Sequence, residues 1–123
     1  MKVNIISISL VSAIDDESMR IAINEAIEAG IFIIAAVGND GPTTDTIGFP
    51  AKYEGVIAVG AIDDELNVTT CSSQGKEIDI VAPGQRILST YLLPHLFAEM
   101  NGTSTAVPFV AGGIALFLSL IHI

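Results

Sequence analysis

A continuous apolar run at 31–37, closed by a glycine at each end, restricts the possible folds more than any other feature of the chain. Such a run is typical of a strand that is buried on both faces of a parallel sheet. The preceding segment, 15–29, begins with two aspartates and carries apolar residues at helical spacing. Residues 3–9 have the composition of another buried strand. Together these segments predict a β-α-β unit with a parallel, right-handed crossover.

The remainder of the chain continues the alternation of short apolar segments and turns. A long helix is expected to begin at Ser104, and strands are expected at 56–62, 77–81, 86–91 and about 97–100. The sequence contains no repeat, low-complexity segment or linker, so residues 1–123 are expected to form one unit. The predicted fold class is α/β, a three-layer sandwich with a mostly parallel sheet between helices.

Half of the residues are hydrophobic (50%), which is a high fraction for a chain of 123 residues. This excess suits a piece of a larger α/β domain, in which buried strands and helices face further elements. The alternative is a membrane protein, because Thr105–Ile121 is nearly uncharged and a membrane span needs about 20 residues. Pro108 and the Gly112-Gly113 pair favour a buried core helix over a membrane span.

The charge of the chain argues against nucleic-acid and anionic-membrane partners, and its cysteine content excludes an internal disulfide. The formal net charge is −9, from 14 acidic and 5 basic residues. No cluster of Lys or Arg occurs, so binding to nucleic acid or to an anionic membrane is not expected. Cys71 is the single cysteine, which rules out a disulfide within the chain.

One serine stands at the head of the long apolar segment near the end of the sequence. Ser104 follows a Gly-Thr turn, so its hydroxyl is expected at a helix N-terminus. Unpaired N–H groups and the helix dipole favour negative charge at that position. A nucleophilic serine needs such surroundings, because its attack on a carbonyl group creates an oxyanion. The ordinary alternative is a serine that only caps the helix.

The pattern Gly-Thr-Ser-x-Ala-x-Pro-x-Val-Ala-Gly at 102–112 resembles the nucleophile motif of the subtilisin-like serine proteases. A second pattern, Ala-Ala-x-Gly-Asn-x-Gly at 35–41, resembles the family segment whose Asn side chain donates to the oxyanion. Further matches follow in family order, and the resemblance covers about 3–118. It implies a serine endopeptidase that forms an acyl-enzyme on Ser104. Asn39 and the Ser104 amide would then be the oxyanion donors, although an Asn here could also be a simple turn residue.

The resemblance also implies that part of the catalytic machinery lies outside the chain. The family triad runs Asp, His, Ser, and its first two members precede all the segments that match here. His95 and His122 lack the family context for the catalytic histidine. We therefore expect the C-terminal half of a catalytic domain, truncated on its N-terminal side and also at its end, with the missing N-terminal half as a partner. Without a general base a serine hydroxyl is a weak nucleophile, so the chain alone is expected to be inactive.

The family's substrate groove maps onto several short segments. Ser9, Leu10 and Val11 resemble the strand that pairs with an extended peptide substrate. The resemblance assigns to the first specificity pocket and its surroundings Ala35, Ala36, Val37, Gly38, Asp40 and Gly48. It also places Thr103 at the substrate site, where its hydroxyl would either add a weaker oxyanion donor or only shape the turn. The family commonly has Gly where Val11 stands, so this branched side chain is expected to narrow the pocket. The expected partner is a peptide or protein substrate.

No cofactor is expected to be required, and calcium enters only as a structural ion. The carbonyls of Ala51, Tyr53 and Val56 resemble a weak family cation site, and oxygen ligands suit Ca²⁺. Two other functions remain open. One is a non-catalytic homologue that binds peptides in the same groove, and the other, ranked far below, is a small nucleotide-binding α/β domain. Both a secreted and a cytoplasmic location agree with the sequence.

Overall fold

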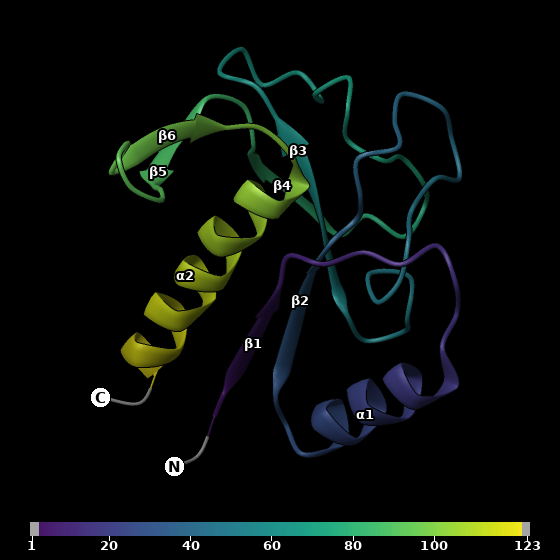
Figure 1. The fold of residues 1–123 in the computed structure, drawn as a ribbon. Helices are drawn as coiled ribbons and strands as arrows, with labels where there is room; N and C mark the ends of the chain where they lie inside the picture. Colours follow the sequence, from purple (N-terminus) through teal and green to yellow (C-terminus); the bar gives the residue numbers. More distant parts are fainter. Residues whose placement is uncertain (1–2, 122–123) are drawn as a thin grey trace.

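The computed structural model describes residues 3–121, and Figure 1 shows their arrangement. A parallel sheet has the strand order β1-β2-β3-β4, with β1 at Ile5–Ile8, β2 at Phe32–Ala36, β3 at Ile57–Ile62 and β4 at Ile80–Pro83. A separate antiparallel hairpin joins β5 (Ile87–Thr90) to β6 (Phe97–Met100). The two helices are α1 (Glu17–Glu28) and α2 (Thr103–Ile121).

The helices lie on opposite faces of the sheet, which gives three layers (Figure 1). Alternating residues of β2 separate the two cores, because successive side chains of a strand point to opposite faces. Ile33 packs in the cluster that contains Ile23 of α1, whereas Ile34 packs in the cluster that contains Ala106 and Val107 of α2. The predicted α/β sandwich with a mostly parallel sheet is therefore confirmed.

Helix α1 begins and ends as its sequence predicts. Asp16 is the N-cap, and its Oδ1 accepts the Met19 N–H at 2.8 Å. Gly30 follows the helix with a φ of 79°, a left-handed conformation that glycine adopts at low cost. Asp15 instead accepts the Tyr53 hydroxyl at 2.9 Å, which links the start of the helix to the loop before β3. Desolvation and this hydrogen bond raise the pKa of Tyr53.

Strand β4 begins later than the predicted 77–81. The Ala58 N–H donates to the Asp79 carboxylate at 2.9 Å, rather than to a backbone carbonyl of the neighbouring strand. The Asp79 N–H still donates to the Ala58 carbonyl oxygen at 3.1 Å, and β4 runs from Ile80 to Pro83.

Strand β1 and helix α2 are only partly buried within residues 3–121. Within residues 3–121, β1 pairs only with β2, so its other edge is open and Ile6 is exposed. The burial of α2 is confined to Thr103, Ala106 and Val107, while Leu116 and Leu120 are 71% and 70% exposed. The helix is long and apolar enough to cross a membrane by length and composition alone. One side of α2 packs on the sheet, where Val110, Ala111 and Ile114 lie against the buried cluster, and its other side is exposed. This agrees with the expectation that the helix faces further elements in a larger domain.

Candidate active site

The loop after β2 meets the first residues of α2. The Thr103 N–H donates to Oδ1 of Asn39 at 2.9 Å, and the Thr103 hydroxyl donates to the same oxygen at 3.1 Å. These two contacts orient the carboxamide, because its oxygen faces the donors of Thr103. The opposite end of the group, the Nδ2 amide, is thereby left as a donor beside the N-terminus of the helix. Asn39 itself is exposed.

Gly102 allows the carboxamide to come this close to the helix. A Cβ atom on Gly102 would lie 3.2 Å from Nδ2 of Asn39 and 3.3 Å from its Oδ1. The φ of Gly102 is 132°, a region that residues with a Cβ rarely adopt. Glycine at this position therefore satisfies both the turn and the close approach of Asn39.

Thr103 is fully buried and ties the two segments together. Its Oγ1 accepts the Gly38 N–H at 3.3 Å and lies 3.3 Å from the Gly38 carbonyl oxygen. With its hydrogen directed to Gly38 or Asn39, the hydroxyl serves to hold the turn. Its assignment as a weak oxyanion donor stays a prediction.

Ser104 is partly buried in the first turn of α2, directly after the residue that holds Asn39. Its Oγ donates to the Ser9 carbonyl oxygen at 3.3 Å, and the Ser9 hydroxyl donates to the Ser104 carbonyl oxygen at 2.9 Å. Ser9 directly follows β1 in the chain. The hydroxyl of Ser104 and the carboxamide of Asn39 therefore lie at the same end of α2.

The segments expected to bind substrate lie around this point. Leu10 and Val11 are exposed, and Val11 packs between two glycines of the expected pocket. A Cβ on Gly48 would lie 2.3 Å from Cγ1 of Val11, and one on Gly38 would lie 3.4 Å from the same atom. Val11 thus lies against both glycines, and its narrowing of the pocket stays a prediction.

The remaining expected pocket residues differ in their exposure to solvent. The side chains of Ala35, Ala36 and Val37 are buried in the two core clusters, so a substrate could contact this segment only along its backbone. Asp40 is exposed, and its N–H donates to the Ser73 hydroxyl at 3.0 Å. Sequence reasoning missed this role of Ser73, because nothing in the local pattern links two residues so far apart.

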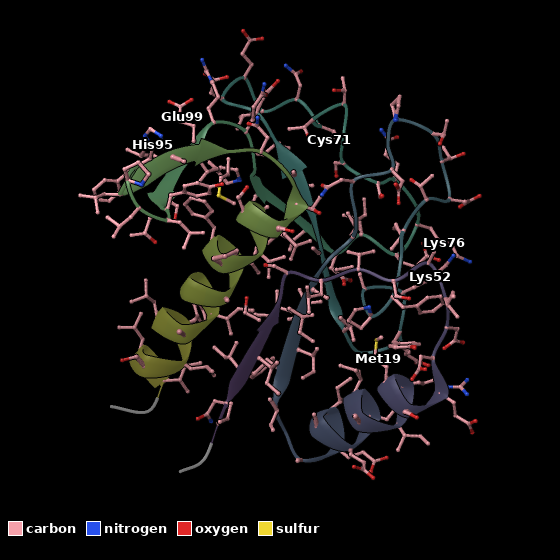
Figure 2. All side chains as sticks on the ribbon, viewed as in Figure 1. Met19, Lys52, Cys71, Lys76, His95 and Glu99 are labelled. Atoms are coloured by element: carbon pink, nitrogen blue, oxygen red, sulfur yellow. The ribbon has the colours of Figure 1, made fainter. Side chains whose placement is uncertain are left out.

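No histidine is near the Ser104 hydroxyl in the described part of the chain. His95 lies on the exposed loop between β5 and β6 (Figure 2), and His122 lies outside the described residues. A cavity of about 460 Å³ opens beside Ser104, between α2 and the hairpin, and is lined in part by Leu88, Met100 and Phe109. Hydroxyl-bearing residues also line this cavity, namely Ser89, Thr90 and Thr105.

The carbonyls expected to bind calcium lie in a compact turn. The Tyr53 carbonyl oxygen already accepts the Val56 N–H at 3.2 Å, which uses one of its two lone pairs. Within residues 3–121, no group of three His, Cys, Asp or Glu side chains is placed to hold a metal ion. A calcium site here would rest on backbone oxygens, and it stays a prediction.

Known proteins match this chain over nearly its whole length. Residues 1–122 match the model of the subtilase family. The chain is 42% identical over 118 residues to subtilisin DY of Bacillus licheniformis, with 94% of this chain and 43% of that protein covered. It is 40% identical over 122 residues to the major intracellular serine protease of Bacillus subtilis, with 96% and 38% covered.

A solved structure shares the fold. The prenylagaramide maturation protease PagA superposes with a TM-score of 0.86 at 35% identity, covering 95% of this chain and 44% of that one. The chain thus spans less than half of the length of each of these three proteins. Because the family model matches residues 1–122 of this chain, the chain belongs to the subtilase family.

Proposed function

We propose that this chain supplies the nucleophile and the oxyanion site of a serine endopeptidase. Ser104 Oγ attacks the carbonyl carbon of a peptide bond, and its proton passes to a histidine from the rest of the domain. The resulting oxyanion accepts hydrogen bonds from Nδ2 of Asn39 and from the Ser104 N–H. Collapse of this intermediate expels the amine, which takes the proton and leaves an acyl-enzyme that water hydrolyses.

One observation carries this proposal. Oδ1 of Asn39 accepts the Thr103 N–H at 2.9 Å, so the carboxamide is anchored one residue before Ser104. A donor fixed in this way needs no reorganisation when charge develops, which is the property that makes an oxyanion site effective. Within residues 3–121, no base contacts the Ser104 hydroxyl, which instead donates to the Ser9 carbonyl oxygen.

The partner we propose is the remaining part of a subtilase domain. The chain spans 43% of subtilisin DY, and two surfaces have no neighbouring element within residues 3–121. The open edge of β1 can accept another strand, because an edge strand leaves a row of backbone groups unpaired. The apolar side of α2 that includes Leu116, Phe117 and Leu120 is exposed. A polypeptide that adds a strand beside β1 and packs on α2 would bury both surfaces.

Labelling with a fluorophosphonate tests the assigned nucleophile. The suitable protein is a chimera in which this chain replaces the matching residues of subtilisin DY. We expect covalent labelling of the chimera and none of its Ser104→Ala variant, because the reagent reports an activated serine hydroxyl. Equal labelling of both proteins would reject Ser104. Absence of labelling in a folded chimera would favour the non-catalytic peptide-binding homologue.

The contact of Val11 with Gly38 and Gly48 predicts a change of specificity. In the same chimera, Val11→Gly should raise kcat/KM for a substrate with Phe before the scissile bond, relative to one with Ala. Removing a branched side chain from a pocket wall admits a larger group, and one methylene is worth about 10- to 200-fold in such pockets. The ratio of the two kcat/KM values measures the effect, with Leu10→Gly as the neighbouring control. An unchanged ratio would mean that Val11 does not border the pocket.

A further inference from the structure

In the first turns of α2, one backbone carbonyl has no N–H donor within the helix. In an α-helix the carbonyl of residue i accepts the N–H of residue i+4. The residue four positions after Ser104 is Pro108, which lies inside α2 and has no N–H. The carbonyl of the proposed nucleophile therefore lacks the hydrogen bond that would normally hold it in the helix.

A side chain from the other end of the sequence takes that place. The Ser9 hydroxyl donates to the Ser104 carbonyl oxygen at 2.9 Å, across a separation of 95 residues. The Ser104 hydroxyl donates in return to the Ser9 carbonyl oxygen at 3.3 Å. The end of β1 and the start of α2 are thus joined by two reciprocal hydrogen bonds, and both involve Ser104.

We infer that Ser9 is a positioning residue, whose hydroxyl replaces the helix hydrogen bond removed by Pro108 and thereby fixes the backbone of Ser104. This inference rests on the proposed function for its catalytic consequence. The Ser104 carbonyl belongs to the peptide unit shared with Thr105, and a bond that fixes this unit restricts ψ of Ser104. It thereby holds the residue that carries both the hydroxyl and the N–H proposed as the second oxyanion donor. Because a misplacement of about 1 Å in a catalytic group can cost on the order of 10²-fold in rate, a bond that fixes this unit affects the rate.

The same arrangement links the nucleophile to the substrate strand. Ser9 belongs to the segment Ser9-Leu10-Val11, which is expected to pair with an extended peptide. Its backbone would serve the substrate while its side chain holds Ser104. Ser9 therefore fixes the position of the Ser104 hydroxyl relative to the segment that is expected to bind the substrate.

A double-mutant cycle in the subtilisin DY chimera tests the inference. The four proteins are the parent, Ser9→Ala, Pro108→Ala and the double variant. With Pro108 present, Ser9→Ala should lower kcat about 3- to 10-fold with little change in KM, which corresponds to one neutral hydrogen bond. With Ala at 108, its N–H can satisfy the Ser104 carbonyl, so Ser9→Ala should cost less than about twofold. Ser9→Thr, which keeps the hydroxyl, should restore most of the rate.

Equal losses in the two backgrounds would overturn the inference. Thermal unfolding of the same four proteins supplies a readout that does not depend on activity. Ser9→Ala should lower Tm by about 2–4 °C when Pro108 is present and by much less when it is replaced. A Tm loss that is independent of residue 108 also overturns the inference. The chimera could show the expected coupling between Ser9 and Pro108 and yet fail to react with a fluorophosphonate. That result would support the Ser9 assignment and reject the proposed function.

Discussion

Peptide hydrolysis by the 123-residue chain alone is expected to lie about 10⁶-fold below that of its chimera with subtilisin DY. That figure is the loss in kcat measured for subtilisin itself when its catalytic Ser or His is removed. The same loss is expected here because, within residues 3–121, the Ser104 hydroxyl donates to a backbone carbonyl and contacts no base. Hydrolysis of a chromogenic peptide by equal amounts of the two proteins measures the difference.

A surface variant separates assembly from chemistry in this comparison. Leu120→Asp places a charge on the exposed apolar side of α2, which the added part of the chimera is proposed to cover. We expect this variant to lose most of its activity, because an unpaired charge in an apolar interface is costly. Leu66→Asp is the matched control, since Leu66 is 78% exposed in the turn after β3. Full hydrolysis by the chain alone, or equal losses in both variants, would contradict the proposed division of the domain.

Local patterns predicted much of the fold because its strongest signals are local. The apolar run at 31–37 indicated β2, and the aspartates before 17–28 indicated where α1 begins. The burial of β1 and α2 could not be predicted in the same way. Their apolar residues indicate the environment in a larger domain, whereas the exposed sides of β1 and α2 depend on which neighbours are present.

The site contacts differ in how far the sequence reveals them. The family resemblance alone predicted that Asn39 and Ser104 share one site, since no periodicity relates residues so distant in sequence. The hydrogen bond from Ser9 to the Ser104 carbonyl needs a folded chain to be seen. Its signal was nevertheless present, because a proline four residues after Ser104 removes a backbone donor whatever the tertiary structure.

Replacing Asn39 by Ala in the chimera should lower kcat by about 10²–10³ and leave KM nearly unchanged. The magnitude is the one known for subtilisin's own oxyanion Asn. Such a donor acts on charge that exists only in the transition state, so its loss lowers kcat and kcat/KM together. Steady-state kinetics on a peptide substrate separate the two constants. A KM that rises while kcat is preserved would assign Asn39 to substrate binding.

Asn39→Asp distinguishes oxyanion stabilisation from a purely structural role. Asp keeps an oxygen to accept the Thr103 N–H, a contact of 2.9 Å in this structure, but replaces the Nδ2 donor with a second oxygen. If Asn39 only held Thr103, Asp would work nearly as well as Asn and clearly better than Ala. If the Nδ2 group stabilises the oxyanion, Asp should lose at least as much kcat as Ala, because a carboxylate offers no donor and repels the developing charge. Near-parent activity of Asn39→Asp would therefore reject the oxyanion role, even if Asn39→Ala were inactive.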